Sequence, residues 1–123
     1  MIALLLAAAI TCSQPITVVD GDTIDVCNLN GVERIRIANL DAPESYRAKC
    51  AKEKLAGIQA KQAAIQFFVR PSVQLDISRH STDRYGRSIA DVSVNGKDFR
   101  QYMITEGHGV QWQFNEKHNW CKE

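Results

Sequence analysis

A tight turn between two short strand-like runs most constrains what this chain can fold into. Ile16 to Asp20 and Thr23 to Cys27 are rich in β-branched residues and flank an Asp20-Gly21 pair. Asp-Gly between two such runs is among the strongest local signals for a β-hairpin, because the turn needs residues that accept positive φ angles. We therefore expect the folded part of the chain to open with an antiparallel hairpin.

The segments after the hairpin predict a further strand and a long helix. Residues 32–40 (VERIRIANL) alternate in hydropathy as a third strand would. Residues 51–69 are rich in Ala, Lys, Gln and Glu, and Pro71 ends the run. Four apolar residues of this run are spaced for one helix face: Leu55, Ile58, Ile65 and Phe68.

The second half of the chain predicts two longer strands, a short helix and a last short strand. Residues 73–78 and 88–94 are strand-like and are separated by a polar loop, residues 79–87. Asn95-Gly96 then turns the chain into a helix over 97–106, and 109–114 is a final strand. Five main strands with two helices predict an α+β fold built on a small, partly open five-stranded barrel.

The chain of 123 residues has the size of one domain, which we place at residues 10–123. The preceding residues 1–9, MIALLLAAA, are wholly apolar but too few to span a bilayer, which takes about 20 residues. They fit the apolar core of a secretory signal with an Ala7-Ala8-Ala9 cleavage pattern, although no basic stretch precedes them. This predicts a secreted or periplasmic protein. The alternatives are a buried first strand and lipidation at Cys12, for which the preceding residues are a poor motif.

Four cysteines, Cys12, Cys27, Cys50 and Cys121, would remain after cleavage. They form no CxxC pair and have no zinc-type spacing to a histidine. An even number behind an export signal predicts two disulfides. Cys12 and Cys27 flank the hairpin turn at similar distances, so we expect Cys12–Cys27 and Cys50–Cys121.

Asp22 is the first candidate functional residue. The turn explains Asp20 and Gly21, but Asp22 shares strand parity with Ile24 and Val26 and should therefore lean toward the apolar face. A carboxylate in that position is costly unless it is paired or binds a metal.

A second group of candidates surrounds a proline. Asp41 and Glu44 lie on either side of Ala42-Pro43, and Arg36 precedes Asp41 by five residues. Taken alone, such a segment is usually a solvated loop. Together with Asp22 it offers an oxygen-only site of the kind that calcium prefers, with magnesium as the alternative metal. The histidines His80, His108 and His118 have no ligand spacing and are expected on the surface.

The third group is the basic connection Asp83-Arg84-Tyr85-Gly86-Arg87. Arginine guanidinium groups match phosphate oxygens in a bidentate manner, and a tyrosine ring stacks on bases. The formal net charge of the chain is only +1, so any attraction for nucleic acid has to be local.

The ordered motifs DGDT, an arginine, DAPE and DRYGR resemble the staphylococcal-nuclease (thermonuclease) family over about residues 16–114. The resemblance implies an OB-type five-stranded barrel with packed helices. It also implies calcium-dependent hydrolysis of DNA or RNA at the 5′-oxygen side, which leaves 3′-phosphate ends. The family's long basic loop and third helix are shortened or absent here.

Roles carried over by position follow from this resemblance. Asp22 and Asp41 would bind calcium through carboxylates and Ala42 through its backbone carbonyl. Arg36 and Arg87 would hold the scissile phosphate, and Glu44 would act as the general base or would orient the attacking water. Two further residues, Arg84 and Tyr85, would contact the bound nucleotide, and Trp112 lies near a family aromatic beside the base.

Two other classes of protein compete with a monomeric nuclease. A non-catalytic nucleic-acid-binding module of the same fold is disfavoured because the residues with catalytic roles are retained. A carboxylate-pair hydrolase acting on sugars would leave the arginines and the DGDT turn without a purpose.

Overall fold

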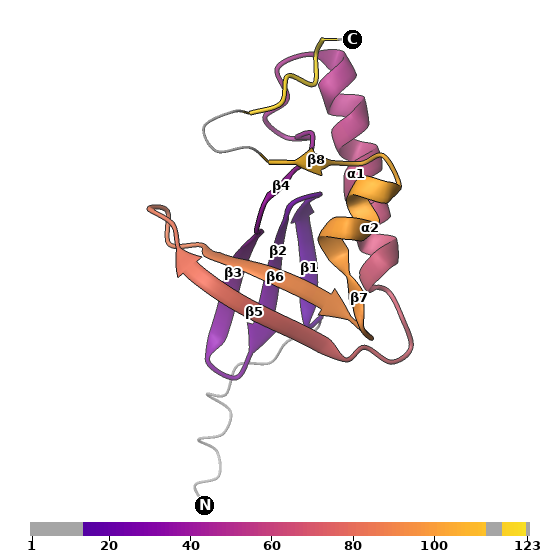
Figure 1. Cartoon of the computed structure of the whole chain (residues 1–123). Coiled ribbons are helices and arrows are strands. Elements are labelled where there is room, and N and C mark those ends of the chain that lie inside the picture. Colours follow the sequence, from indigo (N-terminus) through magenta and orange to yellow (C-terminus); the bar gives the residue numbers. More distant parts are fainter. Residues whose placement is uncertain (1–13, 113–116, 123) are drawn as a thin grey trace, which may run out of the picture.

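The computed structural model describes residues 14–112 and 117–122. The described residues form ten elements: β1 (Ile16–Asp20), β2 (Thr23–Asn28), β3 (Gly31–Ile37), β4 (Leu40–Asp41), α1 (Ala51–Phe68), β5 (Leu75–Thr82), β6 (Ser88–Val94), β7 (Lys97–Asp98), α2 (Phe99–Thr105) and β8 (Val110–Gln111). Figure 1 shows a twisted sheet with α1 and α2 together on one side. Within these described residues, we find no helix long and apolar enough to cross a membrane.

The main sheet has the strand order β1-β2-β3-β6-β5, and β7 pairs with β6 outside this path. The pairs β1–β2, β2–β3 and β5–β6 are antiparallel, whereas β3 and β6 are parallel. In the described part of the chain no ladder joins β1 to β5, so the barrel is partly open. The predicted α+β class and the hairpin around Asp20-Gly21 are confirmed.

The predicted single strand over residues 32–40 is wrong, because the chain bends between β3 and β4. Asn39 has a φ of 57°, a left-handed conformation that asparagine tolerates better than most residues. Arg100 donates to the Ala38 carbonyl oxygen at 2.9 Å and fixes the bend from α2. After the bend, Leu40 and Asp41 pair with β8 instead of with the main sheet.

The polar loop predicted over residues 79–87 is also too long. Strand β5 continues to Thr82, past an irregularity between Arg79 and Ser81, so only residues 83–87 connect it to β6. The second half of β5 is exposed and its side chains pair with charged neighbours, for example Arg79 with Glu33 at 2.6 Å. A fully polar strand shows no alternation of hydropathy, which explains the error. The last strand is shorter than predicted, and residues 113–116 lie outside the described residues.

The predicted face of α1 is largely wrong. Phe68 is buried, but Leu55, Ile58 and Ile65 are 59%, 39% and 37% exposed. The helix turns small residues to the sheet instead, among them Gly57, Ala60 and Ala64. A Cβ built on Gly21 of the hairpin turn would lie only 3.0 Å from Ala60 Cβ, so the helix packs directly on the turn.

The core lies between the sheet and the two helices. Its fully buried side chains include Ile24 and Ile35 from the sheet and Phe67, Phe99 and Met103 from the helices. The ring centroids of Phe67 and Phe99 are 5.1 Å apart, which joins α1 to α2. The hairpin turn therefore packs against a helix that is itself fixed in the core.

A disulfide between Cys50 and Cys121 ties the C-terminal residues to the start of α1, as predicted. Cys50 is also the N-cap of α1, because its Sγ accepts a hydrogen bond from the Glu53 backbone N–H. Cys27 is disulfide-bonded as well, and Cys12, its predicted partner, lies outside the described residues. Figure 1 shows the C-terminal residues beside the first turn of α1.

Candidate active site

Two buried aspartates come together where the hairpin turn meets the segment after β4. Asp22 is 8% exposed and Asp41 is fully buried. Asp22 Oδ2 accepts a hydrogen bond from the Ala42 backbone N–H at 3.0 Å, and its Oδ1 accepts from the Thr23 hydroxyl at 3.0 Å. The bond to Ala42 ties the residue after Asp41 to Asp22 across the fold.

Arg36 lies beside this pair. Its guanidinium donates to the carbonyl oxygens of Ile37 and Leu40, which fixes it on the bend that leads into Asp41. Arg36 Nη2 is 3.6 Å from Asp22 Oδ2, and its side chain is 17% exposed. One fixed cation therefore borders the carboxylates and is still open to solvent.

Glu44 is positioned by its backbone. The buried Glu53 of α1 accepts hydrogen bonds from the Glu44 N–H at 3.1 Å and from the Lys49 N–H at 3.0 Å. Asp20 accepts from the Ser45 hydroxyl at 3.0 Å. These contacts anchor residues 44–49 to α1 and to the hairpin.

Gly57 allows this loop to lie directly on α1. A Cβ built on Gly57 would come within 2.4 Å of both the Glu44 carbonyl carbon and its oxygen. Backbone atoms cannot move aside as a flexible side chain can, so any larger residue there would displace Glu44. Gly57 and Glu53 position the Glu44 loop, and the sequence analysis identified neither of them.

Burial raises the pKa of the Glu44 carboxyl. The nearby Lys117 acts in the opposite direction, and the carboxylates of Asp20, Asp22 and Glu53 add to the rise. A carboxylate with a raised pKa is a stronger proton acceptor than an ordinary one, which suits a general base.

The C-terminal residues also reach this site, which the sequence did not predict. Lys117 Nζ is 3.0 Å from Asp41 Oδ1 and 3.8 Å from Glu44 Oε2. The backbone N–H of His118 donates to Asp41 Oδ2 at 2.8 Å. Both oxygens of Asp41 therefore have a partner from the same short segment, and His118 contributes its backbone although its ring is on the surface.

The donor set fits a hard cation. Among the described residues no three Asp, Glu, His or Cys side chains lie close enough to form a complete metal site. Asp22 and Asp41 supply two carboxylates, however, and backbone carbonyls and water are common further ligands of calcium. The Lys117 ammonium beside Asp41 is direct evidence that this position accepts positive charge.

Arg87 directly precedes β6, the strand that pairs with β3 on the side opposite β2. In the parallel β3–β6 pair Arg36 lies opposite Ile89. Arg87 lies two residues ahead of Ile89 and so comes next to the strand that carries Arg36. Figure 1 shows the turn between β5 and β6 beside the end of β3 from which β4 continues.

Asp83 holds Arg87, a contact that the sequence did not predict. Asp83 Oδ2 accepts from Arg87 Nε at 2.7 Å and Oδ1 from the Arg87 backbone N–H at 2.9 Å. Burial alone would raise the pKa of Asp83, but the hydrogen bonds from Arg87 and Tyr85 lower it below its usual value. An ionised Asp83 thus fixes the guanidinium.

Arg84 and Tyr85 lie at the exposed tip of the same turn. The Tyr85 ring is 69% exposed, with the guanidinium carbons of Arg84 and Arg87 at 5.0 and 5.5 Å from its centroid. The structure thus brings Asp22 into contact with Arg36 and Ala42, and Lys117 links the adjoining Asp41 to Glu44. It leaves Arg84, Tyr85 and Arg87 in a second group without a contact to the carboxylates among the described residues.

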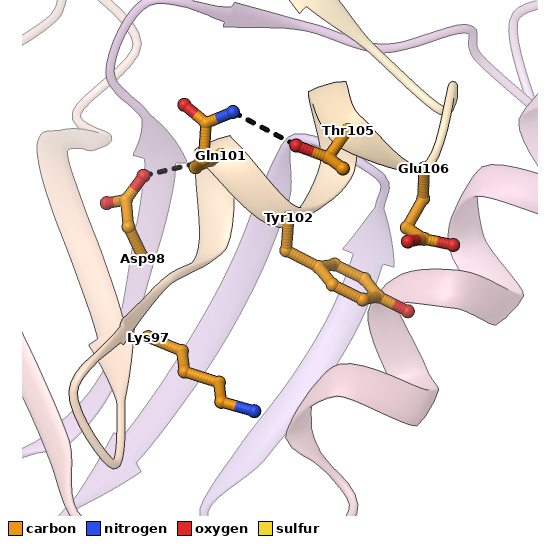
Figure 2. Close-up of a pocket in the computed structure, with 6 residues that line it drawn as sticks. All are labelled: Lys97, Asp98, Gln101, Tyr102, Thr105 and Glu106. Carbon is orange, nitrogen blue, oxygen red and sulfur yellow. Dashed lines mark hydrogen bonds between the residues drawn. The ribbon is translucent and has the colours of Figure 1, made fainter.

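A shallow recess on α2 has no part in this site. Figure 2 shows its lining residues: Lys97, Asp98, Gln101, Tyr102, Thr105 and Glu106. Asp98 caps the helix through the Gln101 N–H at 2.9 Å, and the Gln101 side chain donates to Thr105 at 3.0 Å. These hydrogen bonds stabilise α2, and none of the lining residues is a predicted site residue.

The chain has a partly open α+β barrel of the OB type, with two buried aspartates and Arg36 where the hairpin turn meets the segment after β4. The family model described as "Staphylococcal nuclease homologue" matches residues 34–122, and the chain belongs to this family.

Individual relatives agree with this membership. The chain is 38% identical to protein ParB of Escherichia coli over 82 residues, which is 67% of this chain and 41% of that protein. It is 36% identical to a micrococcal nuclease of Shigella flexneri over 79 residues, 64% of this chain and 40% of that protein. It is 28% identical to the thermonuclease of Staphylococcus hyicus over 92 residues, 75% of this chain and 54% of that protein. The chain thus spans about two fifths of the length of the first two of these relatives.

Proposed function

We propose that the chain is a calcium-dependent nuclease that hydrolyses phosphodiester bonds of DNA, RNA or both. Cleavage at the 5′-oxygen side, leaving 3′-phosphate ends, is the outcome that the family resemblance favours. Membership of a family with relatives named micrococcal nuclease and thermonuclease supports this proposal.

The observation that carries the proposal is the cluster around the Ala42 backbone. The bond from its N–H to Asp22 brings a second buried carboxylate, Asp41, and a half-buried one, Glu44, to the same place. Arg36 borders them at 3.6 Å from Asp22. Two buried acids in one place attract positive charge, which Arg36 and Lys117 supply in this structure and which calcium would supply in the reaction.

In this reaction the residues divide into three tasks. Asp22, Asp41 and the Ala42 carbonyl would hold calcium, which when bound would offset negative charge on the phosphate. Arg36 and Arg87 would bind the phosphate oxygens and stabilise the charge that builds in the transition state.

The third task belongs to Glu44, which would orient the attacking water and accept its proton. The water oxygen would bond to phosphorus as the bond from phosphorus to the 5′ oxygen breaks. The water proton would rest on the Glu44 carboxyl, and the departing 5′ oxygen would take up a proton from solvent. General-base help of this kind is worth about 10²–10⁴-fold in rate. Arg84 and Tyr85 would contact the nucleotide beyond the reacting phosphate.

We also propose export to the periplasm or the medium, with residues 1–9 as part of the signal and action as a monomer. The disulfide between Cys50 and Cys121 supports an oxidising compartment. Sequencing the N-terminus of protein secreted by the host tests export, and recovery only from the cytosol with Met1 intact contradicts it.

The competing function is a nucleic-acid-binding module without activity. The exposed Tyr85 and its two arginines would suit such a module, because rings and guanidinium groups bind bases and phosphates without chemistry. Asp22 and Asp41 would then have only their structural hydrogen bonds, and the Glu44 carboxylate would have no catalytic role.

Digestion of plasmid and denatured DNA distinguishes the two functions. We expect purified protein to degrade both with calcium and to leave them intact with a calcium chelator. Binding of DNA without degradation at any calcium concentration contradicts the nuclease proposal and favours the module.

A further inference from the structure

We propose that Lys117 is a built-in competitor for the metal at Asp41, so that a divalent cation binds only when the Lys117 ammonium moves away. The inference deepens the proposed function, on which it rests, because it concerns the same metal site. The Cys50–Cys121 disulfide is the device that holds Lys117 in place.

The geometry of Asp41 carries the first step. Asp41 is fully buried, and its Oδ1 accepts from Lys117 Nζ at 3.0 Å. The same ammonium lies 3.8 Å from Glu44 Oε2 and so lies between a predicted metal ligand and the predicted base. A calcium ion on Asp41 Oδ1 would have to share this space with a like charge, which Coulomb repulsion opposes.

The second step concerns what keeps Lys117 there. The next residue, His118, donates its backbone N–H to Asp41 Oδ2 at 2.8 Å. Three residues further on, Cys121 is bonded to Cys50, and Lys52 of α1 donates to the Lys122 carbonyl oxygen at 3.2 Å. A tether this short keeps the ammonium at a high effective concentration beside Asp41.

The third step is the consequence for the protein without metal. A buried aspartate is costly without a cationic partner, and Lys117 supplies one. The Lys117 side chain is 44% exposed, so it can swing into solvent when calcium takes its place. The residue would therefore stabilise the metal-free protein and lower its affinity for calcium.

Isothermal titration calorimetry with calcium alone on the oxidised protein tests this inference. We expect Lys117→Gln to bind calcium about three- to fivefold more tightly than the wild type, the upper part of the range for a part-exposed ion pair. Lys117→Arg keeps the charge and should bind like the wild type. Lys122→Gln removes one charge from the same segment while keeping the carbonyl contact, and should stay within about twofold.

Thermal unfolding gives a second readout that needs neither turnover nor nucleic acid. In chelator, Lys117→Gln should unfold at a lower temperature than the wild type. In saturating calcium, the difference in unfolding temperature between the two proteins should be smaller. Equal or weaker calcium binding by Lys117→Gln overturns the inference. If the wild type binds calcium and cleaves DNA, the proposed function survives that result, whereas failure of both proteins to bind calcium overturns both.

The disulfide's part is tested in a double-mutant cycle. Cys50→Ser with Cys121→Ser removes the tether but keeps a good N-cap residue on α1. In this background Lys117→Gln should change the calcium affinity by less than about twofold. An undiminished effect shows that the disulfide does not hold Lys117 and overturns that part of the inference.

Discussion

The sequence predicts some of the contacts that single residues make at this site, but not all of them. Asp22 is buried, as its strand parity predicted, and it contacts Ala42 and Arg36 from the expected motifs. Asp41 is more buried still, but its direct partners come from Lys117 and His118, about 76 residues away along the chain. The local sequence pattern predicts a residue's tendency to be buried. Contacts with residues far away in the sequence become known only from the folded structure.

The first prediction concerns the two aspartates. Asp22→Asn and Asp41→Asn should each weaken calcium binding and lower nuclease activity together, because each removes a charged ligand. Calorimetry and DNA digestion on the same preparations measure the two effects. Asp25→Asn serves as the control, since Asp25 pairs with Arg34 on the surface at 2.8 Å. Loss of activity with unchanged calcium affinity would contradict the metal role.

A second prediction concerns Glu33. Hydrogen bonds from Arg79 and Ser88 lower the pKa of Glu33 from 4.5 to about 2. Because the folded-state pKa lies below the unfolded value, the pair stabilises the fold above about pH 4.5 and loses this contribution as the pH falls toward about 2. We expect the ion pair to contribute about 1 kcal/mol to the free energy of unfolding, because the Arg79 side chain is half exposed.

Urea unfolding of the wild type and of Glu33→Gln between pH 6 and pH 2 measures this contribution. The difference in the free energy of unfolding between the two proteins should shrink as the pH falls through this window. A constant difference would show that Glu33 titrates normally.

Among the elements, α1 departs most from what its sequence predicts. Its apolar residues at helical spacing predicted a buried face, yet Leu55, Ile58 and Ile65 face solvent. Hydrophobic periodicity identifies large apolar residues, but small residues can also form the packed face of a helix. Here Gly57 and Ala60 let α1 pack closely on the Glu44 loop and on the hairpin turn. The hairpin, β6 and the extent of α1 were predictable, because turn chemistry and β-branched runs fix them locally.

The same limit applies to the site. The motif order selects the candidate residues, but the bend at Asn39 and the anchoring of Glu44 by Glu53 depend on contacts between elements. The motif at residues 83–87 indicates no role for Asp83, and its hydrogen bond with Arg87 forms only in the folded turn between β5 and β6.

Gly57→Ala tests how α1 positions the Glu44 loop. Glycine to alanine inside a helix normally stabilises by about 1 kcal/mol. Here we expect the opposite sign, a loss of about 1–3 kcal/mol, because the new Cβ would collide with the Glu44 backbone. Urea unfolding gives the sign, and turnover should fall as Glu44 moves. A stabilised, fully active variant would show that the loop does not pack as described.

At the scale of the whole molecule, one disulfide joins the C-terminal residues, the loop of Glu44 and the start of α1. Cys50 and Cys121 are 71 residues apart in sequence, so their bond closes most of the fold into a ring. The C-terminal segment thereby lies against the carboxylate cluster, where Lys117 and His118 contact both oxygens of Asp41.

Removing this disulfide should destabilise the protein substantially. The chain-entropy model gives up to about 4 kcal/mol for a loop of this length. The double variant Cys50→Ser/Cys121→Ser isolates the effect, since serine keeps the N-cap of α1. Urea unfolding compared with the oxidised wild type measures it. An unchanged free energy of unfolding would mean that the C-terminal segment is held by its other contacts alone.

The central claim is that Glu44 and Arg87 act in catalysis and not merely in binding. In the wild type both lie apart from the groups that form the core, so their loss should leave the fold intact. Glu106→Gln is the matched control, because Glu106 lines the recess on α2 and takes no part in the site.

The most direct measurement is single-turnover DNA cleavage with calcium by Glu44→Gln, Arg87→Ala and Glu106→Gln, with the fold of each verified by circular dichroism. We predict that Glu44→Gln lowers the rate by about 10² or more while nucleotide and calcium binding stay close to those of the wild type. Arg87→Ala should lower the rate severely as well, because its guanidinium is needed most when charge builds on the phosphate. Glu106→Gln should cleave at the wild-type rate. Cleavage at the wild-type rate by folded Glu44→Gln and Arg87→Ala proteins would contradict the proposed active site.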